Sequence, residues 1–348
     1  MEEGSEVTTQ MPTVFDVARV AGVSAATVSR VLNGTARVHP DKVAQVQQAI
    51  ANLGFKAKPF ARGLLAGQIV VVGVMVPNLS DEFCGTLVTG VERALRARGV
   101  HMMCSLGHDD VEEEQRVLNI LQARELGGLI LLADRVPDDV LLELAAQQVP
   151  FVVLNRLLPK LAPHCIRVDN VRGGYLATRH LIESGHTRIA HLTGPLHRLD
   201  VRERLDGYRK ALREAGLPFD ELLLAAASGE TWGEAEGRDL FRRLQGRTNF
   251  TALFAANDFL AVGALKELRG RGLEVPDDLS LVSYDNRSFT ELVTPGLTTV
   301  DYPKLEMGQQ AANHLAALIA GENPPPLPLL TPTLVIRSST RSVNEITS

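Results

Sequence analysis

Short apolar runs alternate with amphipathic stretches from residue 69 to residue 285, and this alternation constrains the fold more than any other feature. The runs lie at 69–76, 100–106, 128–133, 151–155, 188–194, 252–257 and 279–285. Strands that alternate with helices form parallel sheets covered by helices on both faces. A body of this length needs more than one such sheet, so we expect an α/β body of two parallel-sheet lobes.

Residues 14–34 predict a different unit, two short helices joined by a tight turn. Apolar residues recur at helical spacing, first at Val14, Val17, Ala18 and Ala21 and then at Val28, Val31 and Leu32. Gly22 can adopt the left-handed turn conformation, and Ser24 stands where a helix N-cap belongs. The outward set of the second helix is Ala25, Ala26, Ser29 and Arg30. This layout is that of a helix-turn-helix whose second helix enters a DNA major groove, and an ordinary helical hairpin is the alternative.

The charge distribution favours the DNA-binding alternative. Residues 12–68 contain seven Lys or Arg and two Asp or Glu, a net charge of +5, whereas the first eleven residues carry −3 and the remainder −7. A basic head on an acidic body suits a protein that reads DNA with one part and carries a separate module. The acidic residues 1–11 predict a disordered leader and not a secretory signal.

Other features predict a soluble, cytoplasmic protein. No apolar run approaches the length of a membrane span, so no membrane partner is expected. Cys84, Cys104 and Cys165 are scattered and odd in number. They form neither a disulfide framework nor a metal-ligand spacing, and they fit a reducing compartment.

A third helix and a hinge complete the head. The third helix is expected from Pro40 to Leu53, with Gly54 at its end. The segment 55–68 places basic residues beside Phe60, Leu64 and Leu65, but Pro59 and Gly63 make it a poor helix on its own. It is either an interdomain linker or a short helix that orders on DNA and inserts apolar side chains into the minor groove.

The residues DVARVAGVSAATVSRVLNG at 16–34, followed by ARGL at 61–64, resemble the headpiece and hinge of the lactose-repressor/galactose-repressor (LacI–GalR) family. The resemblance extends from about residue 13 to about residue 342. It is closest to the galactose-repressor branch, to which the segments 153–159, 175–192, 204–212 and 249–265 are similar. It implies a periplasmic-binding-protein-like body of two lobes behind the helix-turn-helix head.

The resemblance also implies DNA contacts at matched positions. Ala25 and Ala26 match the base-choosing positions of the recognition helix, where they offer only methyl contacts, for example to a thymine methyl. Arg30 matches a base- or phosphate-contacting arginine, and Leu64 matches the leucine that wedges into the central minor-groove step. The implied phosphate contacts are Thr13, Ser24, Thr27, Ser29 and Asn33, and Arg62 of the hinge is included with the DNA-binding set. The family usually has proline where Ala57 stands, which leaves the exact start of the hinge open.

Polar side chains follow most of the apolar runs, where parallel sheets bind ligands. The polar or aromatic residues in these places are Asn78, Ser80, Asp81, Phe83, Asn155, Arg156, Asp200, Arg202, Arg204, Asn257, Asp258, Asp285 and Asn286. Carboxylates, amides and guanidiniums together suit a neutral polyhydroxylated ligand, and the lone Trp232 suits the apolar face of a sugar. As alternatives, Asn257 or Asp258 caps a helix, Trp232 belongs to the core, and Arg204 forms a surface ion pair.

The resemblance assigns roles at this rim. Arg204, Asn257 and Asp285 match the residues that bind effector hydroxyls in sugar-responsive members, and Trp232 matches their stacking tryptophan. Asn155 stands where several members have an aspartate. Variable wall positions are matched by Asp81, Phe83 and Tyr302.

The sequence thus predicts a repressor that a sugar, galactose or a galactoside, releases from operator DNA. The alternatives are a regulator that uses another sugar or a corepressor, and a sugar-binding receptor without DNA function. An enzyme is not expected, because no catalytic triad, phosphate-cradling loop, paired carboxylates or metal cluster is visible, and no cofactor is expected. The predicted divisions are a leader at 1–11, the helix-turn-helix domain at 12–54, the hinge at 55–68 and an effector-binding and dimerisation domain at 69–348. A homodimer is expected, because the C-terminus lacks leucine heptads.

Overall fold

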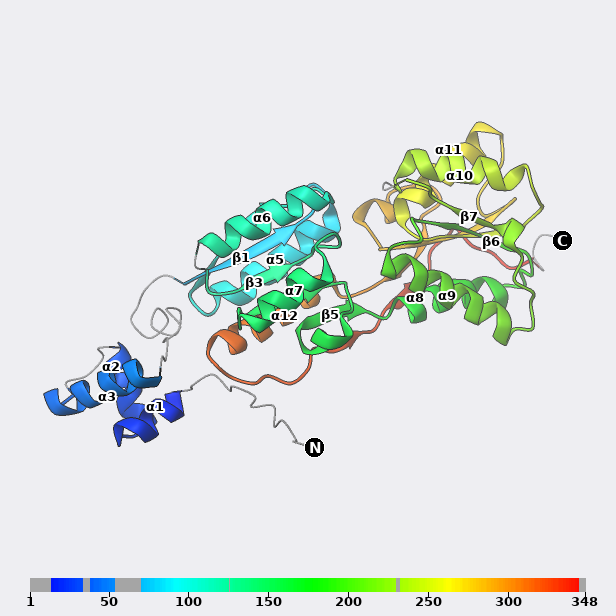
Figure 1. Ribbon diagram of the computed structural model, residues 1–348. Coiled ribbons are helices and arrows are strands. Elements are labelled where there is room, and N and C mark those ends of the chain that lie inside the picture. The colour runs from blue at the N-terminus through cyan, green and yellow to red at the C-terminus, as the bar shows by residue number, and fades with distance from the viewer. Residues whose placement is uncertain (1–13, 34–37, 54–69, 125, 230–231, 344–348) are drawn as a thin grey trace, which may run out of the picture.

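Three helices form the N-terminal head, α1 (Val14–Ala21), α2 (Ala25–Asn33) and α3 (Pro40–Leu53), as Figure 1 shows. The computed structural model describes residues 14–33, 38–53, 70–124, 126–229 and 232–343. Val17, Val28 and Val46 are fully buried and hold the three helices together. Gly22 has a φ of +63° between α1 and α2, so the predicted left-handed turn is confirmed.

The first lobe is built on a six-stranded parallel sheet with the strand order β11-β5-β4-β3-β1-β2. The strands are β1 (Val70–Val76), β2 (Val100–Leu106), β3 (Leu129–Leu131), β4 (Phe151–Leu154), β5 (Cys165–Val168) and β11 (Leu329–Leu330). The surrounding helices are α5 (Glu82–Arg96), α6 (Val111–Ala123), α7 (Asp138–Ala146), the 3₁₀ segment η1 (Pro159–His164) and α12 (Lys304–Ile319). The strands are almost wholly apolar because helices cover both faces of the sheet.

The second lobe repeats this plan with the strand order β12-β10-β9-β8-β6-β7. The strands are β6 (Ile189–Thr193), β7 (Leu224–Ala226), β8 (Ala252–Ala255), β9 (Ser280–Tyr284), β10 (Thr298–Asp301) and β12 (Thr333–Val335). The helical segments are α8 (Asn170–Glu183), α9 (Leu199–Glu214), η2 (Glu221–Leu223), α10 (Glu234–Gln245), α11 (Asp258–Gly270) and η3 (Ser288–Glu291). Only the pairing of β10 with β12 is antiparallel in this sheet.

The lobes are not consecutive halves of the chain. Within the described ranges the chain passes between them after β5, after β10 and after β11. As a result α12, which follows the strands of the second lobe, packs against α5 in the first lobe (Figure 1). The prediction of two parallel-sheet lobes is confirmed, but these exchanges were not predicted from the sequence.

Helices α8 and α9 cover one face of the second sheet and cross at very short range. A methyl group on Gly174 of α8 would lie 2.1 Å from the Arg204 carbonyl oxygen of α9. This contact needs glycine at position 174, and it fixes the backbone from which the Arg204 side chain leaves.

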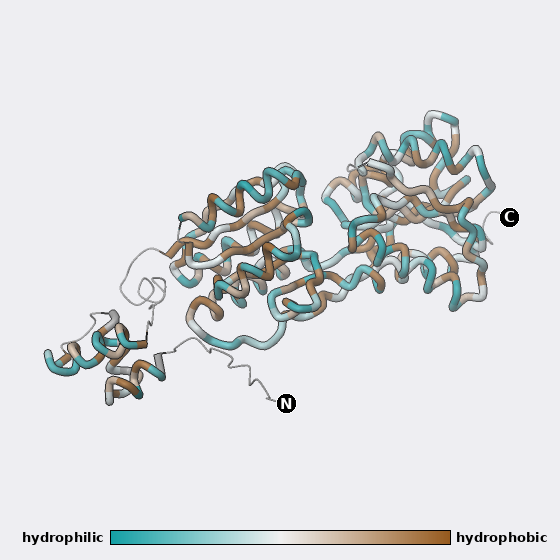
Figure 2. The backbone as a smooth tube through the Cα atoms, in the orientation of Figure 1, coloured by the Kyte–Doolittle hydropathy of each residue, from teal (hydrophilic) through white to brown (hydrophobic). Residues whose placement is uncertain are grey.

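The helices that cover the sheets have a polar and an apolar side, whereas the strands beneath them are mostly apolar, as Figure 2 shows. Among the described helices, none combines the length and the apolar character that a membrane span requires.

Candidate functional site between the two lobes

The carboxyl end of β8 leads into α11 and places Asn257 at the rim of the second lobe. Asn257 Oδ1 accepts a hydrogen bond from the Leu260 amide at 2.7 Å, so Asn257 is the N-cap of α11. Its Nδ2 donates to the Trp232 carbonyl at 3.1 Å. The N-cap alternative is therefore correct, and the same side chain also holds the backbone of Trp232.

Arg204 lies near the centre of this rim on α9, with only 4% of its surface exposed. Its Nη1 donates to the Ala256 carbonyl at 2.6 Å, and its Nε donates to Asn170 Oδ1 at 3.2 Å. The guanidinium carbon lies 3.8 Å from the centre of the Tyr284 ring and 5.7 Å from that of Trp232. Arg204 is therefore a buried cation fixed on several sides, and not part of a surface ion pair.

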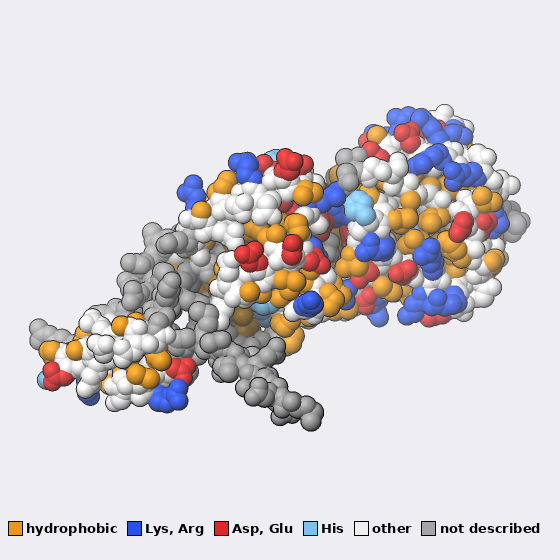
Figure 3. All heavy atoms as spheres, in the orientation of Figure 1, with side chains coloured by type: hydrophobic (Ala, Val, Ile, Leu, Met, Phe, Trp, Pro, Cys, Tyr) orange, Lys and Arg blue, Asp and Glu red, His pale blue; other side chains and the backbone are white. Residues whose placement is uncertain are grey.

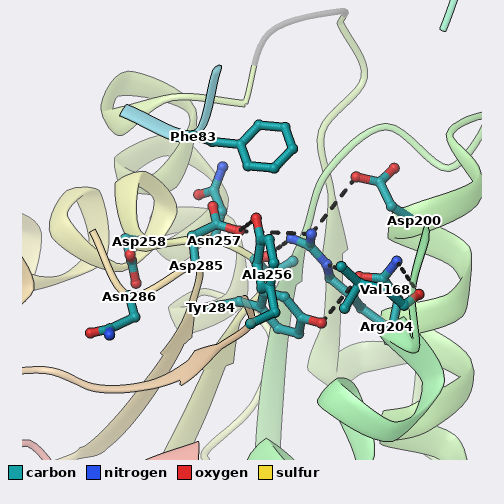
Figure 4. A network of polar contacts seen from close by, with 12 residues as sticks. Phe83, Val168, Asp200, Arg204, Ala256, Asn257, Asp258, Tyr284, Asp285 and Asn286 are labelled. Carbon is teal, nitrogen blue, oxygen red and sulfur yellow. Dashed lines mark hydrogen bonds and ion pairs between the residues drawn. The ribbon is translucent and has the colours of Figure 1, made fainter. Parts of the chain in front are cut away.

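Seven charged side chains of alternating sign cross the rim in one series, which we call the charge chain. In order they are Asp134, Arg198, Asp200, Arg204, Asp285, Arg287 and Asp81, with successive N–O distances of 2.5, 3.3, 3.8, 3.8, 3.7 and 3.0 Å. Figure 4 shows its middle part, from Asp200 to Asp285. The two end residues belong to the first lobe and the rest to the second. The charge chain therefore connects the lobes at two points, one on each side of Arg204.

Burial and charge act against each other along the charge chain. Burial raises the pKa of Asp285, and the guanidiniums of Arg204 and Arg287 oppose that rise. Burial disfavours the charge of Arg204, but Asp285 and Asp200 raise the pKa of Arg204 above its ordinary value. Each buried charge thus depends on its neighbours, and removal of one leaves another desolvated and uncompensated.

Aromatic side chains border the charged cluster. The Tyr302 hydroxyl donates to Asp285 Oδ1 at 3.1 Å, and the ring of Phe83 packs edge-on against Tyr302 at 6.0 Å between centres. Figure 4 shows Phe83, which comes from α5 of the first lobe, over Asn257 and Asp285. Trp232 lies against Gly194, where a methyl group would come within 2.3 Å of the indole ring. The cluster therefore has an aromatic boundary from both lobes.

Two predicted wall residues have additional neighbours. Asp81 binds both terminal nitrogens of Arg287 at 3.0 Å, and it caps α5 by accepting from the Phe83 amide at 2.7 Å. Asn155 follows β4 with a φ of +57° and lines an adjoining cavity together with Asp134. The structure thus brings Arg204, Asn257, Asp285, Trp232, Phe83, Tyr302 and Asp81 into one cluster, with Asn155 beside it.

Asp258, expected at the rim or as a helix N-cap, is instead a buried carboxylate that holds other rim residues in place. Asp258 is completely buried and accepts hydrogen bonds from Ser283 Oγ at 2.5 Å, Thr299 Oγ1 at 2.9 Å and the Arg287 amide at 2.8 Å. Burial, and then the charge of Asp285, raise the pKa of Asp258 to about 7. Asp258 thereby fixes the loop in which Asp285 has a φ of +107°. Its place after an apolar run predicted the rim position of Asp258, but not its burial or its hydrogen-bond partners.

The comparisons with known proteins agree with this architecture. The family model described as bacterial regulatory proteins, lacI family, matches residues 13–58, and that of a periplasmic binding protein-like domain matches residues 178–340. The HTH-type transcriptional regulator GalR of Escherichia coli (strain K12) is 36% identical over 332 residues, which cover 94% of this chain and 96% of that protein. The chain belongs to the lacI family of bacterial regulatory proteins.

Two further relatives extend the comparison. The regulator CelR of Thermobifida fusca is 35% identical over 94% of this chain and 98% of that protein. A structure of a transcriptional regulator CelR–cellobiose complex superposes with a TM-score of 0.71 at 33% identity, and covers 94% of this chain and 99% of that one. The lac repressor dimer bound to operator and the anti-inducer ONPF gives a TM-score of 0.71 at 28% identity, over 96% and 100% of the two chains. This lacI-family chain is a DNA-binding transcriptional regulator and not an enzyme, and its predicted fold class is confirmed.

The head of this family member is described in part. Ser24 accepts a hydrogen bond from the Thr27 amide at 3.2 Å, so it caps α2 as predicted. Arg30 is exposed, whereas Ala25 is half-buried against the head core and faces outward less than expected. Ala26, Ser29 and Asn33 lie on α2, but their side chains fall outside the description. Thr13, Arg62 and Leu64 lie outside the described residues altogether.

The acidic side chains in the described part of the rim do not form a metal site. In the described ranges, no group of three or more His, Cys, Asp or Glu side chains could hold a metal ion. Figure 3 shows acidic, basic and histidine side chains together where the lobes meet, so charges of both signs share this junction. Such a surface suits a ligand with many hydroxyl groups.

Proposed function

We propose that this regulator is a repressor that a sugar, galactose or a galactoside, releases from operator DNA. The observation that carries the proposal is the buried Arg204, fixed between Asp200 and Asp285 at 3.8 Å from each and beside Trp232. Guanidinium groups donate to hydroxyls, carboxylates accept from them, and an indole face packs on the C–H face of a sugar ring. Arg198, which pairs with Asp200 and also lies 5.7 Å from the centre of the Trp232 ring, extends the same combination along the rim.

In this proposal Arg204, Asn257 and Asp285 bind sugar hydroxyls and Trp232 stacks on the ring. Asp81, Phe83, Asn155 and Tyr302 form the wall. Each charge of the cluster already has a partner of opposite sign, so a neutral ligand can enter without bringing an unpaired charge into a buried site. This pairing supports a neutral sugar as the effector.

The head supplies the DNA function in the same proposal. Ala25 and Ala26 offer methyl contacts to bases, Arg30 contacts a base or phosphate, and Leu64 enters the minor groove. The proposed phosphate contacts are Thr13, Ser24, Thr27, Ser29, Asn33 and Arg62. A homodimer would place two heads on a two-fold-symmetric operator.

Release is a shift of population between two arrangements of the lobes. A ligand shifts such an equilibrium only by its differential affinity for the two states. The cross-lobe pairs Asp81–Arg287 and Asp134–Arg198 are among the contacts that change if the lobes move. Asp285 contacts Arg287, and Asp200 contacts Arg198. A sugar bound to these two carboxylates therefore acts directly on both cross-lobe pairs.

Fluorescence anisotropy on DNA from upstream of the gene, at fixed salt and with a panel of neutral sugars, tests the proposal. Tight binding that galactose or a galactoside abolishes is the expected result. Tight binding that no neutral sugar alters would contradict the assigned effector class. Tighter binding in the presence of a sugar would identify a corepressor and contradict release.

A further inference from the structure

Asn170 lies at the crossover that leads from β5 to the second lobe. Strand β5 of the first lobe ends at Val168 and helix α8 of the second begins at Asn170, so one residue separates the two elements. The Asp169 amide donates to the Leu330 carbonyl of β11 at 2.9 Å, which fixes this residue to the sheet of the first lobe. A change in the arrangement of the lobes therefore alters the backbone directly before Asn170.

The side-chain amide of Asn170 uses both its acceptor and its donor atom. Its Oδ1 accepts from Arg204 Nε at 3.2 Å and from the Tyr284 hydroxyl at 3.1 Å. Its Nδ2 donates to the Val168 carbonyl and to Glu203 Oε2, at 3.4 Å in each case. An asparagine amide has two donor and two acceptor places, so all four are filled. Asn170 is only 2% exposed, and these protein partners set the orientation of its amide.

Asn170 thereby connects two adjacent residues of opposite charge on α9. Arg204 Nε can only donate and the Glu203 carboxylate can only accept, so one orientation of the amide satisfies both. Glu203 also pairs with Arg167 of β5 at 2.6 Å, which is a contact between the lobes. A continuous series of polar contacts thus runs from Arg167 in the first lobe through Glu203 and Asn170 to Arg204.

The crossover after β10 reaches the same cluster. Tyr302 lies between β10 of the second lobe and α12 of the first, and its hydroxyl donates to Asp285 Oδ1 at 3.1 Å. Arg204 and Asp285 lie 3.8 Å apart at the centre of the rim. Each of these two opposite charges is therefore held by a side chain that belongs to a crossover or directly follows one.

The nitrogens of the Arg204 guanidinium face different groups. Nε donates to Asn170, and Nη1 donates to the Ala256 carbonyl at 2.6 Å. Nη2 lies 3.8 Å from Asp200 Oδ2 and from Asp285 Oδ1, which is too long for a hydrogen bond, so a ligand hydroxyl can bind between them. A guanidinium is planar and rigid, so a ligand that moves Nη2 also moves Nε. Such a movement acts directly on Asn170.

We infer that Asn170 is the positioning residue that couples ligand binding at Arg204 to the arrangement of the lobes. Its amide is buried and fully hydrogen-bonded, so it acts through Arg204 and the crossover and does not contact the ligand. The inference rests on the proposed function, in which the effector binds Arg204. It goes further because it names the residue through which that binding reaches the operator-binding state.

Asn170→Asp separates the two sides of this residue. The aspartate keeps an acceptor for Arg204 Nε but has no donor, and it places a second carboxylate against Glu203, so the link to the crossover is lost. Calorimetry with galactose on the full-length protein should show about threefold weaker binding, whereas the factor by which saturating galactose weakens operator binding should fall by about tenfold. Fluorescence anisotropy measures this release factor, and the other neutral sugars of the panel are measured in the same way.

Asn170→Ser removes the amide without adding a charge, so the test does not depend on one variant. Both contacts of the amide are lost, and affinity and release factor should each fall by about tenfold. Asn119→Asp is the control, because Asn119 is exposed on α6 and contacts Gln115 there at 3.2 Å. A wild-type release factor in both Asn170 variants would overturn the inference even if sugar affinity fell, because Asn170 would then only position Arg204.

A double-mutant cycle without sugar tests the inference independently of the effector. Operator affinity is measured for Asn170→Asp, for Arg204→Lys and for the variant with both substitutions. Each single substitution should change operator affinity by about threefold, and the double variant should change it no further, because one contact carries both effects. Additive effects, or single variants with wild-type operator affinity, would contradict the inference. A wild-type protein that no neutral sugar releases would contradict the proposed function, whereas this cycle would still decide the role of Asn170.

Discussion

The two lobes hold their rim loops by the same device, but to different degrees. In the second lobe Asp258 uses both carboxylate oxygens, on Ser283, Thr299 and the Arg287 amide. In the first lobe Glu114 uses only Oε2, which accepts from the amides of Arg135 and Val136 at 2.9 Å.

The remaining oxygen of Glu114, Oε1, is buried without a hydrogen-bond partner among the described residues. The loop with Asp285 is therefore fixed more firmly than the loop with Asp134. The comparison indicates that the second lobe is the preorganised binding surface. The first lobe, which we call the responding lobe, is the part that moves when sugar binds.

The largest effect is expected from Arg204→Lys in the preorganised lobe. Lysine keeps the charge but lacks the planar fork that reaches Asn170 and Ala256 together, so sugar affinity should fall by about 100-fold. Calorimetry measures this loss, with Arg209→Lys on the exposed side of α9 as the control. Wild-type affinity in Arg204→Lys would show that the second lobe does not bind the sugar through this residue.

Removal of each loop-holding carboxylate compares the lobes directly. In Asp258→Asn one acceptor oxygen becomes an NH2 donor, so Ser283, Thr299 and the Arg287 amide no longer meet two acceptor oxygens; this should disturb the Asp285 loop and weaken sugar binding by about tenfold. Glu114→Gln acts on the loop of the responding lobe and should weaken sugar binding by only about threefold. Equal losses in the two variants would remove the proposed asymmetry.

The same two carboxylates should make stability depend on pH. Burial raises the pKa of Glu114 and of Asp258 to about 7; Asp134 and Asp109 add to the effect at Glu114, and Asp285 adds to it at Asp258. The folded protein therefore binds more protons than the unfolded chain between about pH 4 and about pH 7, so the free energy of unfolding falls as pH rises through this window.

Urea unfolding at about pH 5 and about pH 7 measures this fall, which each neutral variant should reduce by about 1–2 kcal/mol. An unchanged pH dependence in both variants would show that these groups do not titrate in the window.

A smaller effect is expected at the cross-lobe pairs. Asp134→Asn removes the attraction to Arg198 at one end of the charge chain, while Asp200 still compensates that arginine. Sugar affinity should change by about fivefold, and the sugar concentration that releases the operator should change with it. Asp206→Asn on α9 is the control, because Asp206 pairs only locally with Arg209 in the described contacts. An unchanged release concentration would contradict a role for this pair.

The smallest effect is expected in the head, which serves as an outside reference for both lobes. Ser24→Ala removes the N-cap of α2 and should cost about 1 kcal/mol of local helix stability. Operator affinity should fall by about threefold, whereas sugar affinity should stay the same. A change in the calorimetric affinity for sugar would show that the head contributes to the effector site.

The sequence predicted the elements of the fold well because its signals there are local. Apolar runs predicted most of the strands, and the Gly22 turn and the Ser24 cap agree with the structure. Side chains after strand ends predicted the rim, and Arg204, Asn257 and Asp285 do lie together. The helix-cap role of Asn257 was an open alternative, and the structure confirms the cap at the same rim position.

The contacts between the lobes were beyond sequence reasoning for a physical reason. Arg287 and Asp81 are 206 positions apart, and their pairing depends on how two separately folded sheets are placed. The pair Asp134–Arg198 has the same origin. The location of α12 in the first lobe likewise depends on chain crossings that leave no local pattern in the sequence.

The most direct test of the account measures whether sugar and operator oppose each other's binding. Thermodynamic linkage requires that the factor by which sugar weakens operator binding equals the factor by which operator weakens sugar binding. Calorimetric titration of the full-length protein with sugar, with and without saturating operator DNA, measures the second factor, and anisotropy measures the first. The account predicts equal factors well above one, which Asp134→Asn reduces. A sugar affinity that operator DNA leaves unchanged would contradict it.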